Sequence, residues 1–112
     1  MISVRLVREA DGAFVSCTAD GHSGYAEPGS DIVCSAVSVL IRTAARVLSE
    51  MEGVELGSNT GGRGHADFFV KTAGCALEAK RCLVFAGRFL AAGLDSIAKE
   101  FPKHLELLNQ TV

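Results

Sequence analysis

Residues 31–52 form a long, predominantly apolar segment, and any fold of this chain has to bury it. Its apolar residues recur every three to four positions, which predicts one long amphipathic helix. Ser30 and Asp31 stand at its start and are residue types that cap helix N-termini. The first half of the segment is apolar on nearly every side, which indicates burial against two surfaces or against a partner.

A second long helix is predicted over residues 74–100, where apolar residues again follow a helical spacing. Phe101 and Pro102 close this segment, because proline cannot continue the hydrogen-bond ladder of a helix. The apolar stripe of this helix is expected to comprise Ala79, Cys82, Ala86, Phe89, Leu90 and Ile97.

The remaining segments have the alternation or the β-prone composition of strands. Asp11-Gly12 separates the first two and favours a two-residue hairpin turn, and residues 61–64 join the next two. The order β-β-α-β-β-α predicts a two-layer α+β domain, in which two long helices cover an antiparallel sheet. The expected strands are residues 2–6, 14–19, 54–60 and 65–71, with 104–108 as a possible short C-terminal strand.

The length and the net charge of the chain limit the number of domains and the classes of function that it can have. The 112 residues suit one domain, residues 1–112. With 11 basic and 13 acidic residues the net charge is -2, which disfavours nucleic-acid binding. The N-terminus does not resemble a signal peptide, and no apolar run reaches the roughly 20 residues of a membrane span. We therefore expect a cytoplasmic protein that does not contact membranes.

The four cysteines are expected to be free thiols, since the cytoplasm keeps thiols reduced. No Cys-x-x-Cys pair is present, and a zinc site from Cys17, His22, Cys34 and His65 matches no standard spacing. Cys17, Cys75 and Cys82 are interpreted as core residues. The glycine-rich residues 61–64 lack the Lys-Ser/Thr of a phosphate-binding loop. No metal or cofactor is expected.

Residues 21–34 carry the pattern that points to chemistry. Cys34 would be the third residue of a helix capped by Asp31, where unpaired amides and the helix dipole stabilise a thiolate. The glycine-rich loop of residues 20–30, expected to be mobile, can bring His22 back to this thiol as a base. The amides of Cys34 and a neighbour could also stabilise an oxyanion.

Ordinary structural roles compete with this interpretation. A cysteine in an apolar helix is usually a core residue, and a loop histidine usually faces solvent. Asp31 caps the helix in either case, and it is close enough to orient His22 or the loop. Ser38 lies one turn after Cys34, where it could contact the thiol or the substrate, or bond a backbone carbonyl.

At this point the sequence resembles the ribosomal-processing cysteine proteases, the Prp family. The resemblance lies in Gly21-His22, Gly29, residues 31–34 and residues 36–38. It also extends to the chain length, the order of elements and the Phe101-Pro102 ending. Ser23 departs from the family pattern, where alanine is common, and Ser35 replaces a small apolar residue.

The resemblance implies a small bacterial cysteine endopeptidase, typically a homodimer. Such enzymes remove a short N-terminal extension from a large-subunit ribosomal protein. By matching position, Cys34 would be the nucleophile and His22 the base. Asp31, Ser38 and Gly21 would orient groups or contact substrate.

Other functions stay open. A non-catalytic peptide-binding factor of ribosome assembly would use the same loop to hold a peptide without cleaving it. A thiol redox sensor would need Cys17 as the partner of Cys34. Separately, the two apolar helices exceed what one thin sheet can cover, so we expect a homodimer.

Overall fold

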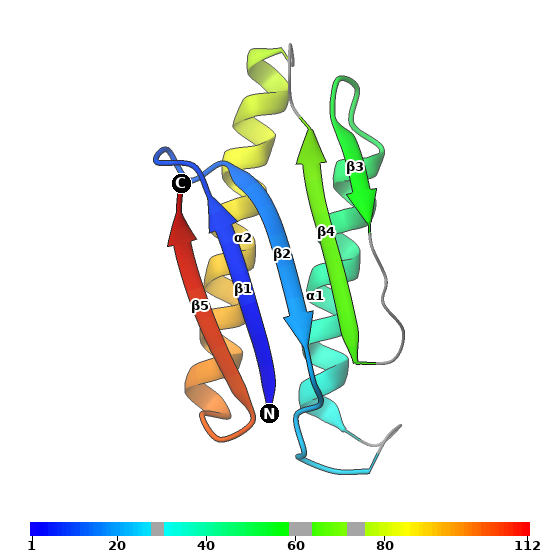
Figure 1. Ribbon diagram of the computed structural model, residues 1–112. Coiled ribbons are helices and arrows are strands. Elements are labelled where there is room, and N and C mark those ends of the chain that lie inside the picture. The colour runs from blue at the N-terminus through cyan, green and yellow to red at the C-terminus, as the bar shows by residue number, and fades with distance from the viewer. Residues whose placement is uncertain (28–30, 59–63, 72–75) are drawn as a thin grey trace.

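The computed structural model describes residues 1–27, 31–58, 64–71 and 76–112. It confirms the α+β class and the predicted order of elements, with a fifth strand at the C-terminus (Figure 1). The elements are β1 (Ile2–Arg8), β2 (Phe14–Asp20), α1 (Ile32–Ser49), β3 (Glu55–Ser58), β4 (His65–Lys71), α2 (Leu77–Glu100) and β5 (Leu105–Thr111).

The five strands form one sheet in the order β3-β4-β2-β1-β5. The pairs among β1 to β4 are antiparallel, as predicted, whereas β5 lies parallel to β1 and makes the sheet mixed. β5 is longer than the expected 104–108 and pairs from Leu105 to Thr111. Its last residues, from Asn109 on, are polar and exposed, so they carry no apolar alternation to reveal a strand.

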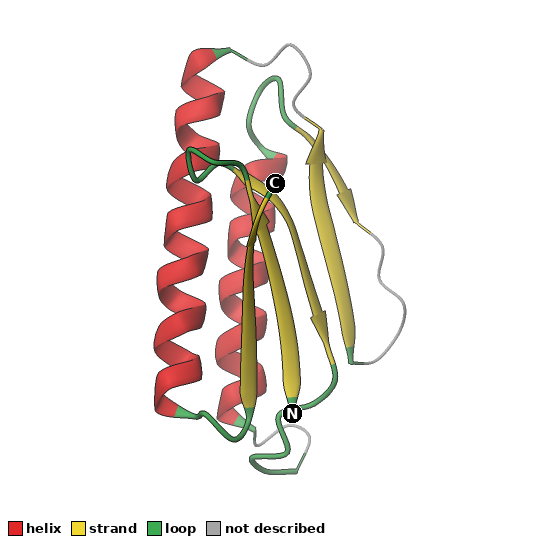
Figure 2. Ribbon diagram, turned by 60° about the vertical axis from the view of Figure 1, so that its left-hand side comes forward, coloured by secondary structure: helices red, strands yellow, loops and turns green. Residues whose placement is uncertain are grey.

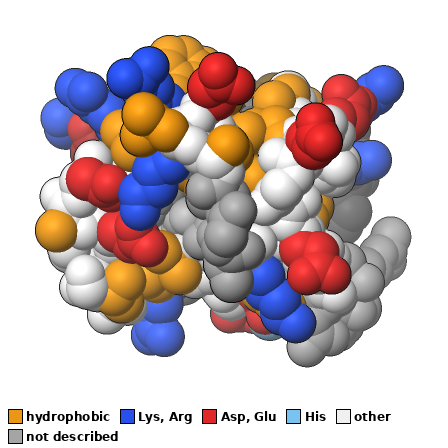
Figure 3. Space-filling view, turned by 90° about the horizontal axis from the view of Figure 1, so that it is seen from above, with side chains coloured by type: hydrophobic (Ala, Val, Ile, Leu, Met, Phe, Trp, Pro, Cys, Tyr) orange, Lys and Arg blue, Asp and Glu red, His pale blue; other side chains and the backbone are white. Residues whose placement is uncertain are grey.

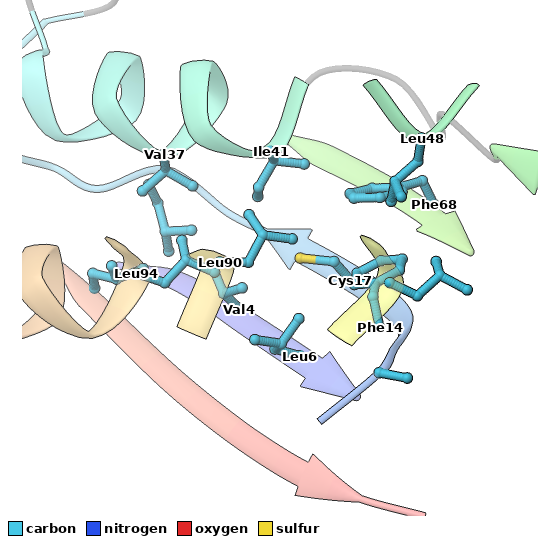
Figure 4. Close-up of a cluster of buried hydrophobic side chains, with 14 of the residues drawn as sticks. Val4, Leu6, Phe14, Cys17, Val37, Ile41, Leu48, Phe68, Leu90 and Leu94 are labelled. Carbon is cyan, nitrogen blue, oxygen red and sulfur yellow. The ribbon is translucent and has the colours of Figure 1, made fainter. Parts of the chain in front are cut away.

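Both helices lie side by side on one face of the sheet (Figure 2). The core fills the space between the layers, where side chains from α1 and α2 meet those of β1, β2 and β4 (Figure 4). The rings of Phe14 and Phe68 stack there with centroids 4.9 Å apart. Each such fully buried apolar side chain contributes about 1.5–3 kcal/mol to folding. The largest buried side chains include Phe14, Leu6, Leu48, Leu83, Leu90 and Leu94.

The connection between β1 and β2 is longer than the predicted two-residue turn. It runs from Glu9 to Ala13, whose backbone groups are joined by a hydrogen bond of 2.8 Å. Within this connection only Gly12 has a positive φ, of 95°, whereas the side chain of Asp11 accepts the amide of Ala13 at 2.9 Å. The aspartate therefore stabilises the loop by accepting a backbone amide and does not adopt the left-handed conformation that a two-residue turn needs.

The predicted apolar stripe of α2 is partly wrong. Cys82 and Phe89 are exposed, and the face toward the core holds Leu83 and Leu94 in addition to Ala79 and Leu90. α2 carries two apolar faces, and the helical spacing alone did not show which one the sheet covers. The expectations for Ser30, residues 61–63, Gly74 and Cys75 lie outside the described residues.

Helix α1 is the one helix in the described ranges that is long and apolar enough to cross a membrane, with a mean hydropathy of 1.6 over 18 residues. Four of its side chains are buried in the core, as in an amphipathic helix that covers a sheet. Figure 3 views the end of the molecule away from the start of α1, and there acidic, basic and apolar side chains are interspersed. The buried residues of α1 are Val33, Val37, Ile41 and Leu48.

Candidate active site

The end of β2, the start of α1 and the start of β4 meet at one end of the molecule, beside the turn between α2 and β5 (Figure 1). A pocket of about 250 Å³ opens there. Four of the five candidate residues from the sequence line it, and the fifth, Asp31, is not among the lining residues. The lining residues are Ile2, Ala19, Gly21, His22, Cys34, Val37, Ser38, Gly64, His65 and Ala66.

Cys34 is the third residue of α1, as predicted, and its side chain is partly exposed. The backbone N–H of Ser23 donates a hydrogen bond to its Sγ atom over 3.4 Å. The sulfur therefore lies at the positive end of the helix dipole and also receives a hydrogen bond from the loop. Both interactions stabilise negative charge on sulfur.

His22 is exposed and faces the same pocket from the loop after β2. Gly64 packs against its ring, because a Cβ atom at position 64 would lie only 2.8 Å from His22 Nε2. Gly21 has a φ of +94°, and a Cβ there would come within 2.6 Å of the Met1 carbonyl oxygen. Both glycines thus make room for the path of the chain around His22.

Asp31 caps α1 and also holds the loop. Its Oδ1 accepts the amides of Val33 and Cys34, each at 3.0 Å. Its Oδ2 accepts the hydroxyl of Ser23 and the amides of Tyr25 and Ala26, the last two at 3.2 and 3.4 Å. The two carboxylate oxygens of Asp31 therefore link the loop to the start of the helix.

Asp31 is buried, with 6% of the residue exposed. Burial by itself raises its pKa, but the hydrogen bonds from the Ser23 hydroxyl and from the amides of Cys34, Ala26 and Val33 outweigh that effect. They hold the pKa of this carboxyl below its usual range. Asp31 is therefore ionised at neutral pH and places a negative charge at the start of α1.

The amides that sequence reasoning assigned to an oxyanion are occupied. Cys34 and Val33 donate to Asp31 Oδ1, and the amide of Ser35 donates to the Asp31 carbonyl at 3.1 Å. The capping side chain thus takes the donors that the helix end would otherwise present to a substrate. Ser38 is exposed at the pocket one turn after Cys34, where it can face a bound molecule.

Sequence reasoning missed the contributions of Ser23, His104 and Tyr25. Ser23 is 2% exposed, and its carbonyl accepts a hydrogen bond from His104 Nδ1 over 2.8 Å. The ring of Tyr25 packs edge-on against both His104 and Phe101, with centroids 5.4 Å apart in each case. Only Ser23 carried a signal in the sequence, as a departure from the family pattern.

A second histidine, His65, also lines the pocket. His65 Nδ1 contacts Asp20 Oδ1, and these two residues are cross-strand partners on β4 and β2. In the described part of the chain, no three His, Cys, Asp or Glu side chains are placed to hold a metal ion. The zinc set considered from the sequence is therefore not formed.

Cys17 is a core residue, as predicted, and is 1% exposed. Burial, helped by the negative charge of Asp67, raises the pKa of its thiol to about 12. A buried and protonated thiol is a poor partner for disulfide formation. This environment counts against a redox pair between Cys17 and Cys34.

Solved structures with the same fold include proteins from S. aureus and Streptococcus mutans. The essential ribosomal processing protease Prp from S. aureus, with a covalently linked product peptide, matches with a TM-score of 0.80 and 22% identity over 98% of this chain and 100% of that chain. SMU.848 from Streptococcus mutans matches with a TM-score of 0.77 and 21% identity over 100% of this chain and 96% of that chain. The S. aureus protease with a substrate peptide matches with a TM-score of 0.74 and 21% identity over 98% and 100%.

These identities establish a shared fold. A comparison with curated protein sequences found no significant match. The family model described as cysteine protease Prp matches residues 1–106, which is nearly the whole chain. With a cysteine and a histidine gathered in one pocket of that shared fold, this chain belongs to the Prp family of cysteine proteases.

Proposed function

We propose that this protease removes a short N-terminal extension from a large-subunit ribosomal protein, with Cys34 as the nucleophile and His22 as the general base. The observation that carries the proposal is the pocket that Cys34 and His22 share at the start of α1. A thiol at a helix N-terminus and an imidazole in the same pocket are the two groups that acyl transfer by cysteine requires.

The reaction follows from these positions. His22 takes the proton of Cys34, the sulfur electron pair forms a bond to the scissile carbonyl carbon, and the carbonyl π pair moves to oxygen. When this tetrahedral species collapses, the C=O bond re-forms, the C–N bond breaks and His22 gives its proton to the leaving amine. Water, activated by the same imidazole, then hydrolyses the thioester and frees Cys34.

The choice of substrate is supported by the related structures. The S. aureus protease of the same fold is described as a ribosomal processing protease and is known with a substrate peptide and with a covalently linked product peptide. A pocket of about 250 Å³ at the end of a sheet suits a few residues of an extended chain. We place the reaction in the cytoplasm, where thiols stay reduced.

We further propose that the protein is a homodimer. The outer face of α2 exposes Leu77, Phe85 and Phe89, which share one side of the helix, and the two phenylalanine rings stack 6.2 Å apart. Exposed apolar surface of this kind marks interaction sites. Light scattering at micromolar concentration should give a dimer for the wild type and a monomer for Phe85→Glu; a wild-type monomer would contradict the proposal.

The decisive experiment incubates the protein with the ribosomal precursor of the same organism and reads its mass. The wild type should shorten the precursor at its N-terminus, whereas Cys34→Ser and His22→Ala should leave it intact. Cys82→Ser is the matched control, since Cys82 is exposed on α2 away from the pocket. An intact precursor with the wild type, or its binding without cleavage, would favour the peptide-binding alternative.

A further inference from the structure

We propose that the backbone N–H of Ser23 stabilises the oxyanion in this enzyme, and that His104 is the residue that positions it. The inference rests on the proposed role of Cys34 as the nucleophile. Ser23 follows β2 and His104 precedes β5, and the fold brings these two residues, 81 positions apart, into hydrogen-bond contact.

The first amides of helix α1 already have hydrogen-bond acceptors. A helix N-terminus usually presents free amides, and in other cysteine hydrolases the amide of the nucleophile can serve the oxyanion. Here Asp31 Oδ1 accepts the amides of Val33 and Cys34 at 3.0 Å, and the Asp31 carbonyl accepts that of Ser35. These three amides are therefore engaged, and an oxyanion needs a donor other than these.

The loop supplies such a donor. The N–H of Ser23 points at Cys34 Sγ over 3.4 Å. During attack, the oxyanion is separated from this sulfur by a single carbon atom, so a donor aimed at the sulfur reaches the space where the negative charge develops. The same N–H stabilises the thiolate before attack and the oxyanion after it.

Ser23 is held rigidly, as a preorganised donor must be. The residue is 2% exposed, and its hydroxyl donates to Asp31 Oδ2. That hydroxyl also accepts the amide of Tyr25 at 3.1 Å. On the other side, the Ser23 carbonyl accepts a hydrogen bond from His104 Nδ1 at 2.8 Å.

His104 reaches Ser23 from the turn between α2 and β5. Since a carbonyl oxygen only accepts, Nδ1 of His104 carries the proton in this contact. The backbone of His104 is itself anchored, because its carbonyl accepts the amide of Ile2 at 2.9 Å and its N–H donates to the Phe101 carbonyl at 2.9 Å. The ring of Tyr25 covers the imidazole. His104 thus joins the loop to the end of α2.

Two reagents separate an effect on the oxyanion from an effect on the thiolate. p-Nitrophenyl acetate acylates a cysteine through a tetrahedral oxyanion, whereas iodoacetamide alkylates it by direct displacement without one. Both rates are measured at pH 7 on the intact protein in a Cys82→Ser background, and the rate that remains in Cys34→Ala is subtracted. The ratio of the acylation rate to the alkylation rate measures how much the oxyanion donor contributes to acylation.

Two variants of His104 isolate the hydrogen bond. His104→Phe keeps a ring against Tyr25 but has no donor, and it should lower the ratio about tenfold, a part of the 10²–10³ lost when an oxyanion donor is removed. His104→Asn places an amide NH₂ near the position of Nδ1 and should restore the ratio to within about twofold. For peptide cleavage, kcat should fall in His104→Phe with little change in KM. Lys103→Met, an exposed neighbour on the same turn, is the control.

An unchanged ratio in His104→Phe would overturn the proposal, as would a parallel fall of both rates, which indicates an effect on the thiolate alone. An equal loss in His104→Asn and His104→Phe would assign the effect to packing and would also overturn it. The proposed function fails separately, if Cys34→Ala still cleaves the precursor or if the wild type shows no reaction at Cys34 with either reagent.

Discussion

The two long helices of this protein begin in different ways. At α1, the side chain of Asp31 accepts two helix amides and also binds three donors of the preceding loop. At α2, Ala76 occupies the cap position and makes no side-chain hydrogen bond, and only Glu78 in the first turn complements the helix dipole. Both helices pack on the same sheet face, so packing requires neither arrangement.

The difference between the two helix starts shows what the Asp31 cap contributes to the site. Asp31 fixes the loop and the helix to one another, and the loop in turn places an N–H on the sulfur of Cys34. The helix contributes the field of its dipole, and the loop contributes the directed hydrogen bond. Within the described residues at the start of α2, the cap residue Ala76 offers no side chain that could make such links.

The largest expected effect comes from removing the sulfur at the start of α1. Cys34→Ala should lower kcat/KM for peptide cleavage by at least about a thousandfold, since the nucleophile is lost. Folding should persist, because the side chain is small and partly exposed. Cleavage assays and circular dichroism measure the two outcomes. A variant that retains a tenth of the activity would show that another group attacks the peptide.

The next effect separates the two functions of Asp31. Asp31→Ser keeps a good N-cap residue but loses Oδ2, which holds Ser23, Tyr25 and Ala26. We expect the helix to remain and kcat to fall about tenfold or more, because the donor at Ser23 is no longer preorganised. Wild-type kcat in this variant would show that the loop needs no link to the cap.

The pH dependence of stability tests the same carboxylate. The pKa of Asp31 is lower in the folded protein than its unfolded value of about 3.9, so the unfolded chain binds more protons in acid. This stabilisation is fully present above pH ~4 and is lost as the pH falls toward the folded pKa. Thermal unfolding between pH 2 and 6 should show a shallower decline for Asp31→Ser. Parallel curves would assign the acid sensitivity to other groups.

The smallest effect comes from giving α2 the cap that it lacks. Ala76→Asp should raise the free energy of unfolding by about 0.5–1 kcal/mol, because its carboxylate can accept amides of the first turn. Denaturant titration measures the change. Cleavage activity should stay at the wild-type level, since this end lies away from the pocket, and a loss of activity would show that the two ends are coupled.

Local patterns predicted the part of the site that lies within a few residues of Asp31. The cap, the third-residue position of Cys34 and the apolar face of α1 all follow from spacings of three to four residues. Ser23 and His104 are 81 positions apart, and no local spacing connects them. The occupied amides also escaped prediction, because a cap and an oxyanion donor set have the same pattern in sequence.

The sequence by itself determined the order of the elements, the capped start of α1 and the candidate pair of Cys34 and His22. Tertiary structure decided which apolar face of α2 meets the sheet, that β5 pairs in parallel with β1, and that the turn before β5 holds the loop beside the nucleophile. The physical reason is the sequence separation over which each interaction acts. Periodicity and capping act between neighbours along the chain, whereas face, pairing and loop position depend on contacts that exist only once distant segments have packed.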